Sequence, residues 1–207
     1  MTTITIPIEL EFTVRPAAVM SAMERALSPA LVADDAPAPT MGEFCTGCSP
    51  QPVTQLVLQH KPGTHWPEQG GWYAGAHMTP AGEWWHLIVP DAHMQTLVDV
   101  KWGEYGAEVP GADSIHDGQV NTAAMADAGN ELAQRVQALG DGLYLPARTE
   151  ALLMFSTLKH VIGDGPLWTS TQYSAGNAWY QLFDSGTQDI SSKGCEFRAV
   201  PVRRLFL

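Results

Sequence analysis

Two strand-like runs joined by a short turn place the strongest constraint on how this chain folds. Residues 70–78, GGWYAGAHM, and residues 83–89, EWWHLIV, are rich in aromatic and β-branched side chains. The residues between them, TPAG, contain the proline and glycine that favour a turn. This pattern predicts a β-hairpin, and therefore an antiparallel pair of strands.

Two helical patterns follow the hairpin. Over residues 121–139 apolar side chains recur at helical spacing before Gly140, at Met125, Ala128, Leu132, Val136 and Leu139. A second helix is predicted to begin at Pro146, with an inward face of Leu152, Phe155 and Leu158. From residue 167 onward, strand-like runs alternate with Gly/Ser turns. Together these patterns predict an α+β fold with two helices and a small mixed or antiparallel sheet.

The N-terminal part of the chain has a different character. Residues 3–15 alternate strictly between apolar and polar side chains, which predicts an amphipathic strand, and Pro7 favours a place at a sheet edge. A short helix is expected over residues 16–27, and the Ala-, Pro- and Asp-rich residues 28–40 have the composition of a linker. We expect residues 1–40 to serve attachment or oligomerisation, because an unpaired strand edge is a template for pairing with another chain.

Charge and composition exclude several classes of partner. The 207-residue chain has a net charge of −11, so it would be repelled by nucleic-acid phosphates and by anionic membranes. It has no apolar stretch of membrane-spanning length, and its first residues lack the pattern of a secretory signal, so we expect synthesis in the cytoplasm. Three cysteines are an odd number and argue against a full disulfide framework.

Residues 41–67 form a connector that holds a possible metal site. Cys45, Cys48, His60 and His65 have a spacing close to a Cys2His2 zinc pattern, C-x2-C-x11-H-x4-H. Against zinc, Lys61-Pro62-Gly63 interrupts the helix that usually carries the two histidines. A local disulfide, or two buried thiols without a metal, remain open alternatives.

The stretch from Leu167 to Gln188, LWTSTQYSAGNAWYQLFDSGTQ, is rich in aromatic and small polar residues and carries almost no charge. Strand alternation separates Trp179 and Phe183 from Tyr180, and we expect the core to take Trp168, Trp179 and Phe183. The outward, candidate ligand-binding set is then Tyr173, Asn177, Tyr180, Leu182 and Asp184. Tyrosine and asparagine suit adaptable recognition, although each of these residues could instead pack on a neighbouring loop or subunit.

The remaining charged residues suggest structural roles. Glu150 lies at a helix start, where a carboxylate favours the helix dipole. Three arginines near the end of an acidic chain are expected to pair with carboxylates, either internally or across subunits: Arg198, Arg203 and Arg204. No carboxylate pair stands in a catalytic motif, and we do not expect an enzyme.

Four ordered segments carry a resemblance to a known family: residues 117–125 (DGQVNTAAM), 142–155 (GLYLPARTEALLMF), 167–188 and 197–205 (FRAVPVRRL). They resemble the phage branch of the Lcl C-terminal domain family, which has a C-type-lectin-like fold. In that family a W-x-L-P-[ST]-R-x-E-L segment starts a helix, a W-S-S-T-x-Y-S segment follows, and an R-x-V-R-R end closes the sheet. Here Tyr144 precedes Leu145-Pro146 without the tryptophan, Thr169 replaces a serine, and Pro201 interrupts the final motif.

The resemblance covers residues 68–207 and implies a function. It implies a tail-fibre or baseplate protein of a tailed-phage virion, a homo-oligomer such as a trimer, that contacts other tail proteins and a host-surface glycan or protein. A purely structural tail module without a receptor is the alternative. The calcium-binding triplets of sugar-binding C-type lectins are missing, so calcium is not expected. The paired copper-binding cysteines of the related formylglycine-generating enzyme are missing too, since the 68–207 segment has a single cysteine, Cys195.

Overall fold

The computed structural model describes residues 60–206, and these residues form an α+β domain of three α-helices and two sheets. The strand, helix and linker expected within residues 1–40 lie outside the described residues, as do Cys45 and Cys48. The sequence predicted two helices and one sheet, so the class is confirmed and both numbers are corrected for this part of the chain.

The first sheet contains the predicted hairpin. Its strands are β1 (Thr64–Trp66), β2 (Gly71–Met78), β3 (Trp84–Pro90) and β9 (Arg203–Leu205), in the order β1-β2-β3-β9. All neighbours are antiparallel. Short 3-10 turns, Pro67–Gln69 and Asp91–His93, follow β1 and β3. The last strand therefore lies beside the first hairpin, although more than 100 residues of chain separate them.

The second sheet is mixed. It contains β4 (Leu97–Lys101), β5 (Pro166–Gln172), β6 (Asn177–Leu182), β7 (Gln188–Ser192) and β8 (Glu196–Ala199), in the order β4-β8-β5-β6-β7. The pairing of β5 with β8 is parallel and the other pairings are antiparallel.

The helix predicted over residues 121–139 is two helices, α3 (Gly118–Asp127) and α4 (Glu131–Ala138). Gly129 adopts a positive φ of 78°, which ends the first helix. Asn130 begins the second, because its side chain accepts a hydrogen bond from the backbone of Ala133 at 3.0 Å. The apolar stripe nevertheless crosses the break, and Met125, Leu132 and Val136 are buried, while Ala128 is exposed.

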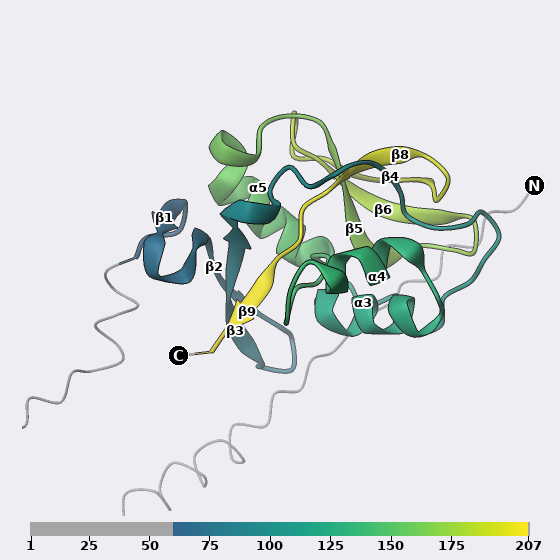
Figure 1. The fold of residues 1–207 in the computed structure, drawn as a ribbon, viewed down its shortest axis with the longest axis horizontal. Coiled ribbons are helices and arrows are strands. Elements are labelled where there is room, and N and C mark those ends of the chain that lie inside the picture. The colour runs from purple at the N-terminus through teal and green to yellow at the C-terminus, as the bar shows by residue number, and fades with distance from the viewer. Residues whose placement is uncertain (1–59, 207) are drawn as a thin grey trace, which may run out of the picture. The chain divides into compact units, whose positions relative to one another are not determined.

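The third helix, α5 (Arg148–Ile162), lies between the two sheets and contacts β2 on one side and β5 and β6 on the other (Figure 1). Its buried stripe is Ala151, Met154, Leu158 and Ile162. Leu152 was predicted to face inward but is exposed, because it lies away from this stripe on the helix surface.

Two clusters of buried side chains hold the domain together. One joins α5 to the first sheet through Leu87, Val89, Met154 and Phe183. The other joins α3 and α4 to the second sheet through Trp102, Met125, Val136 and Trp168. The prediction that Trp168 and Phe183 belong to the core is confirmed.

Asn130→Ala should lower the free energy of unfolding by about 1–2 kcal/mol, because it removes the N-terminal cap of α4. The same change removes the hydrogen bond from the Asn130 amide to the carbonyl of Trp102, 2.7 Å long. Urea denaturation measures the effect. Gln134→Ala, on the exposed face of the same helix, is the matched control and should change stability by less than about 0.5 kcal/mol. Equal effects of the two substitutions would contradict the capping role.

Candidate functional site

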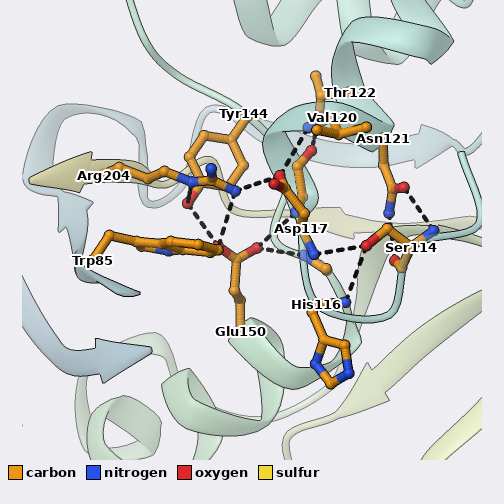
Figure 2. A network of polar contacts seen from close by, with 12 residues as sticks. Trp85, Ser114, His116, Asp117, Val120, Asn121, Thr122, Tyr144, Glu150 and Arg204 are labelled. Carbon is orange, nitrogen blue, oxygen red and sulfur yellow. Dashed lines mark hydrogen bonds and ion pairs between the residues drawn. The ribbon is translucent and has the colours of Figure 1, made fainter. Parts of the chain in front are cut away.

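A buried carboxylate lies where α5, α3 and the first sheet meet (Figure 2). Glu150 is fully buried. One of its oxygens, Oε1, accepts hydrogen bonds from Trp85 Nε1 at 3.0 Å and from the Tyr144 hydroxyl at 2.7 Å. The other, Oε2, accepts from the backbone N–H groups of Ala147 at 2.8 Å and Gly118 at 3.1 Å. Four donors from separate parts of the chain therefore converge on one side chain.

An arginine from the last strand completes this arrangement. The Arg204 guanidinium lies 3.6 Å from the centre of the Trp85 ring and 4.0 Å from Glu150 Oε1. It also forms an ion pair with Asp117, whose carboxylate caps α3 by accepting from the backbone of Val120 at 2.9 Å. We call Trp85, Asp117, Tyr144, Glu150 and Arg204 the carboxylate hub.

The three C-terminal arginines differ in their partners. The predicted carboxylate pairing is confirmed for Arg204. Within the described residues the other two have different partners, because Arg203 donates to the side chain and carbonyl of Gln69 and Arg198 donates to the carbonyls of Ile162 and Asp164. Pairing of these two across subunits stays a prediction. Carbonyl oxygens at chain turns satisfy these guanidinium groups as carboxylates would.

The environment of Glu150 shifts its proton affinity. Burial raises the pKa of Glu150 to about 7, against the opposing effects of its hydrogen bonds and of Arg204. Glu150 lines neither of the two surface hollows described below, and of the hub residues Tyr144 alone lines the smaller one. We therefore interpret Glu150 as a residue that positions structural elements, which is more than the helix-dipole role that the sequence indicated.

A second buried charged side chain, Lys193, holds surface segments together. Lys193 is fully buried, and its ammonium donates to the carbonyl of Ala107 at 2.5 Å and to Gln172 Oε1 at 2.7 Å. The same Gln172 oxygen accepts from the backbone of Val109 at 2.8 Å. Burial lowers the pKa of Lys193 to about 8, with the charge of Glu108 acting in the opposite direction. These bonds tie together residues 102–109, 172–177 and 192–195, which we call the tyrosine platform.

Two tyrosines give this platform its name. Tyr105 is 76% exposed and Tyr173 is 57% exposed. Their loops are joined by a hydrogen bond from Gly106 N to Ala175 O, 3.1 Å long. The Tyr105 ring lies so close to Gly176 that a Cβ there would come within 2.8 Å of it. The platform therefore presents aromatic rings on backbone that is held in place.

A hollow of about 960 Å³ adjoins Tyr105. Its wall carries two cationic side chains, Lys101 and Arg135. It also carries five carboxylates, which make it predominantly acidic: Asp99, Glu104, Glu108, Glu131 and Glu196. A smaller hollow of about 300 Å³ lies beside α3, around Gln119 and Tyr144.

The candidate binding residues predicted from the sequence lie in two separate places in the structure. Tyr173 and Asn177 belong to the tyrosine platform. Leu182 and Asp184 lie at the opposite end of β6, roughly 20 Å away at about 3.3 Å per strand residue. There Asp184 is occupied in a turn, since its carboxylate accepts from the backbone of Gly165 at 2.9 Å.

The predicted faces of β6 need correction. Tyr180 was expected outward, but it packs against Trp168 and Phe197 of the core. Trp179 was expected in the core, but it is half-buried beneath the Arg148 guanidinium, 3.5 Å from its ring centre, with Tyr173 against its edge. Side chains on both faces of β6 are buried or half-buried, so the alternation of residues along the strand could not identify a solvent-exposed face.

The possible metal ligands within the described residues have other contacts. His60 stacks on Trp66 with ring centres 4.0 Å apart, and His65 Nε2 lies 2.6 Å from Asp91 Oδ2. Residues 60–206 contain no group of three or more potential metal ligands. Because Cys45 and Cys48 lie outside this range, zinc binding stays a prediction.

Neither a comparison with protein-family models nor a search of curated proteins finds a match to this chain. Within residues 60–206, no helix has the length and apolar character needed to cross a bilayer. The site is therefore interpreted from its own geometry.

Glu150→Gln should destabilise the protein by about 3 kcal/mol at pH 5, because the amide keeps one accepting oxygen, while its NH₂ group can only donate and would face two of the four donors. The folded-state pKa of about 7 lies above the ordinary value of 4.5, so the stability that Glu150 contributes is complete below pH 4.5 and declines as the pH rises through 7. The difference in unfolding free energy between wild type and E150Q should therefore narrow from pH 5 to pH 8.

The exposed Glu83→Gln serves as the control and should change the unfolding free energy by less than about 0.5 kcal/mol. A difference that widens with pH would indicate that the four donors hold Glu150 ionised.

Proposed function

We propose that this chain is a tail-fibre or baseplate protein of a tailed-phage virion, and that its α+β domain has the C-type-lectin-like fold of the Lcl C-terminal domain family. The domain recognises a host-surface glycan or protein through the tyrosine platform. Residues 1–40 attach it to other tail proteins or to further copies of itself.

The position of the family-like motifs supports the proposed fold. Asp117, Tyr144 with Glu150, and Arg204 come from three of the four motifs and meet in the carboxylate hub. Trp168, from the fourth, is fully buried in the core. The end of the chain also returns beside the first hairpin, as the resemblance implies, because β9 pairs with β3. Motif residues that are far apart in the sequence but contact one another in the structure are the ones expected to define a fold.

The observation that carries the proposed recognition is a pair of exposed tyrosines on joined loops, one of which, Tyr105, lines an acidic hollow. Tyrosine rings offer flat apolar area together with a hydroxyl. Ionised carboxylates accept hydrogen bonds and donate none, so the hollow suits a partner rich in hydroxyl or amine donors. A neutral glycan has this chemistry, whereas an anionic glycan would be repelled by the wall and by the net charge of −11.

The second candidate, a structural tail module without a receptor, is favoured by a different surface. Three large apolar side chains, Met78, Trp84 and Phe206, are exposed near the tip of the hairpin and the end of β9. Exposed apolar groups of this size suit contact with another protein. Binding measurements distinguish the two functions.

Tyr105→Ala and Tyr173→Ala should each weaken binding to neutral glycans or host cells roughly tenfold, because exposed aromatic side chains are frequent energetic centres of recognition. A glycan array, together with competition between the purified protein and phage for adsorption to host cells, measures the effect.

Phe206→Ala is the matched control, since it removes another exposed aromatic ring away from the platform and should leave binding unchanged. If the wild type binds neither glycans nor cells and does not reduce adsorption, the structural function is the better one. Loss of binding in F206A alone would indicate that the partner contacts the hairpin surface and not the tyrosine platform.

A further inference from the structure

One arginine of this acidic chain has guanidinium donors that its neighbours leave unused. Arg148, the first residue of α5, is half-buried. Its Nε atom donates to Gln188 Oε1 at 3.1 Å, but within residues 60–206 its Nη1 and Nη2 atoms have no hydrogen-bond acceptor. No carboxylate of this range lies within 4.0 Å of it either, although the chain has 22 acidic residues and 11 basic ones. Its outer N–H groups are therefore available to a partner.

The Arg148 guanidinium is nevertheless held in one place. Its carbon atom lies 3.5 Å from the centre of the Trp179 ring. Gln188 anchors Arg148 at two points, because its side-chain oxygen accepts from Nε and its amide donates to the Arg148 carbonyl at 2.7 Å. Burial lowers the pKa of Arg148, which indicates that part of its hydration shell is lost. A fixed and partly dehydrated donor loses little freedom and little solvation when it binds an acceptor.

Apolar surface borders this guanidinium. Tyr173 is exposed, and its ring meets the edge of Trp179 with the ring centres 5.6 Å apart. Ile190 pairs with Trp179 across β6 and β7, so both side chains stand on the same face of the second sheet. Both are half-buried. We call Arg148, Tyr173, Trp179 and Ile190 the guanidinium–tryptophan site, in which a fork of donors lies beside aromatic and aliphatic carbon.

The chemistry of this site selects a group that combines an acceptor oxygen with apolar carbon. The acetamido group of an N-acetylated sugar is planar and neutral, its carbonyl oxygen accepts hydrogen bonds, and its methyl group packs on aromatic rings. A sugar hydroxyl offers an acceptor without the methyl group. A carboxylate also fits a guanidinium fork, but the net charge of −11 disfavours the approach of an anionic glycan.

We propose that the guanidinium–tryptophan site binds the acetamido group of a neutral, N-acetylated glycan. The carbonyl oxygen accepts from Arg148 Nη1 or Nη2, and the methyl group packs against Trp179 and Tyr173. This inference rests on the proposed function and names the ligand class, because Tyr173 belongs both to the tyrosine platform and to this site. Sugar hydroxyls can then donate to the carboxylates of the acidic hollow beside Tyr105, while acetamido groups accept from Arg148.

Triacetylchitotriose and cellotriose test this preference as matched ligands, since they share one backbone and differ only in carrying an acetamido group or a hydroxyl at the same carbon of each ring. NMR titration of the full-length protein gives both dissociation constants. The wild type should bind triacetylchitotriose roughly tenfold more tightly than cellotriose, which is the effect of one well-placed hydrogen bond. Cellotriuronate, the same backbone with a carboxylate on each ring, should bind more weakly than triacetylchitotriose.

Arg148→Lys keeps the positive charge but loses the planar fork, so it should reduce the preference for triacetylchitotriose to about twofold or less. Its affinity for cellotriose should stay close to that of the wild type. Tyr173→Ala should instead weaken the binding of both ligands, since it removes apolar surface that both contact. Arg198→Lys is the matched control and should keep the preference. The Arg198 guanidinium donates to the carbonyl of Ile162, which ends α5 roughly 21 Å from Arg148 at about 1.5 Å per helical residue.

Equal affinity of the wild type for triacetylchitotriose and cellotriose overturns the acetamido site and leaves the proposed recognition of glycans in place. This comparison needs no variant, so it decides the matter even if Arg148→Lys does not fold. A preference that persists in Arg148→Lys also overturns the proposal, as does tighter binding of cellotriuronate, because the fork would then take a carboxylate. If the wild type binds neither glycans nor host cells, the proposed function and this inference fall together.

Discussion

The domain depends on one buried carboxylate and the four donors that meet it. Glu150 receives hydrogen bonds from β3, from the residues before α5, and from the first turns of α3 and α5. Taking a carboxylate out of water is costly, which is why burial raises the pKa of Glu150 to about 7, and the four donors and the nearby cation offset part of that cost. Each of these elements is fixed relative to the others through a side chain that lines neither of the two hollows described above. The carboxylate hub is therefore best understood as the junction that fixes helices α3 and α5 relative to strands β3 and β9 of the first sheet.

Local patterns in the sequence predicted the parts of this fold whose causes are local. The hairpin and the α+β class follow from alternation, turn residues and helical spacing, and these predictions are confirmed. The prediction of a single helix over residues 121–139 was wrong, because the apolar stripe on which it relied continues across the break at Gly129. The break is stabilised by the bond from Asn130 to Trp102, a residue 28 positions earlier. Such a contact has no signature in a local window.

The candidate site was predictable to a similar extent. Tyr173 and Asn177 could be found because aromatic and amide side chains stand out in a stretch with little charge. Lys193 could not, since a lysine between small residues in a turn is normally solvated, and its burial becomes evident only when Ala107 and Gln172 are in place. Tyr105 gives no sequence signal either, because its importance comes from its contact with Gly176. A rigid platform is favourable for recognition, since little conformational freedom is lost when a partner binds.

The pairing of β9 with β3 has a consequence for how the protein acquires its structure during synthesis. The hairpin, α3 and α5 are all translated before Arg204, yet the ion pair of Arg204 with Asp117 and the closing strand of the first sheet need residues 203–205. A nascent chain still held at the ribosome can form its helices, but its first sheet keeps an open edge at β3 until residues 203–205 have been synthesised. Contacts of such long sequence separation also slow folding. The order of synthesis thus leaves the β3 edge of this sheet unpaired until β9 is made, and makes it a place where a neighbouring nascent copy could pair by mistake.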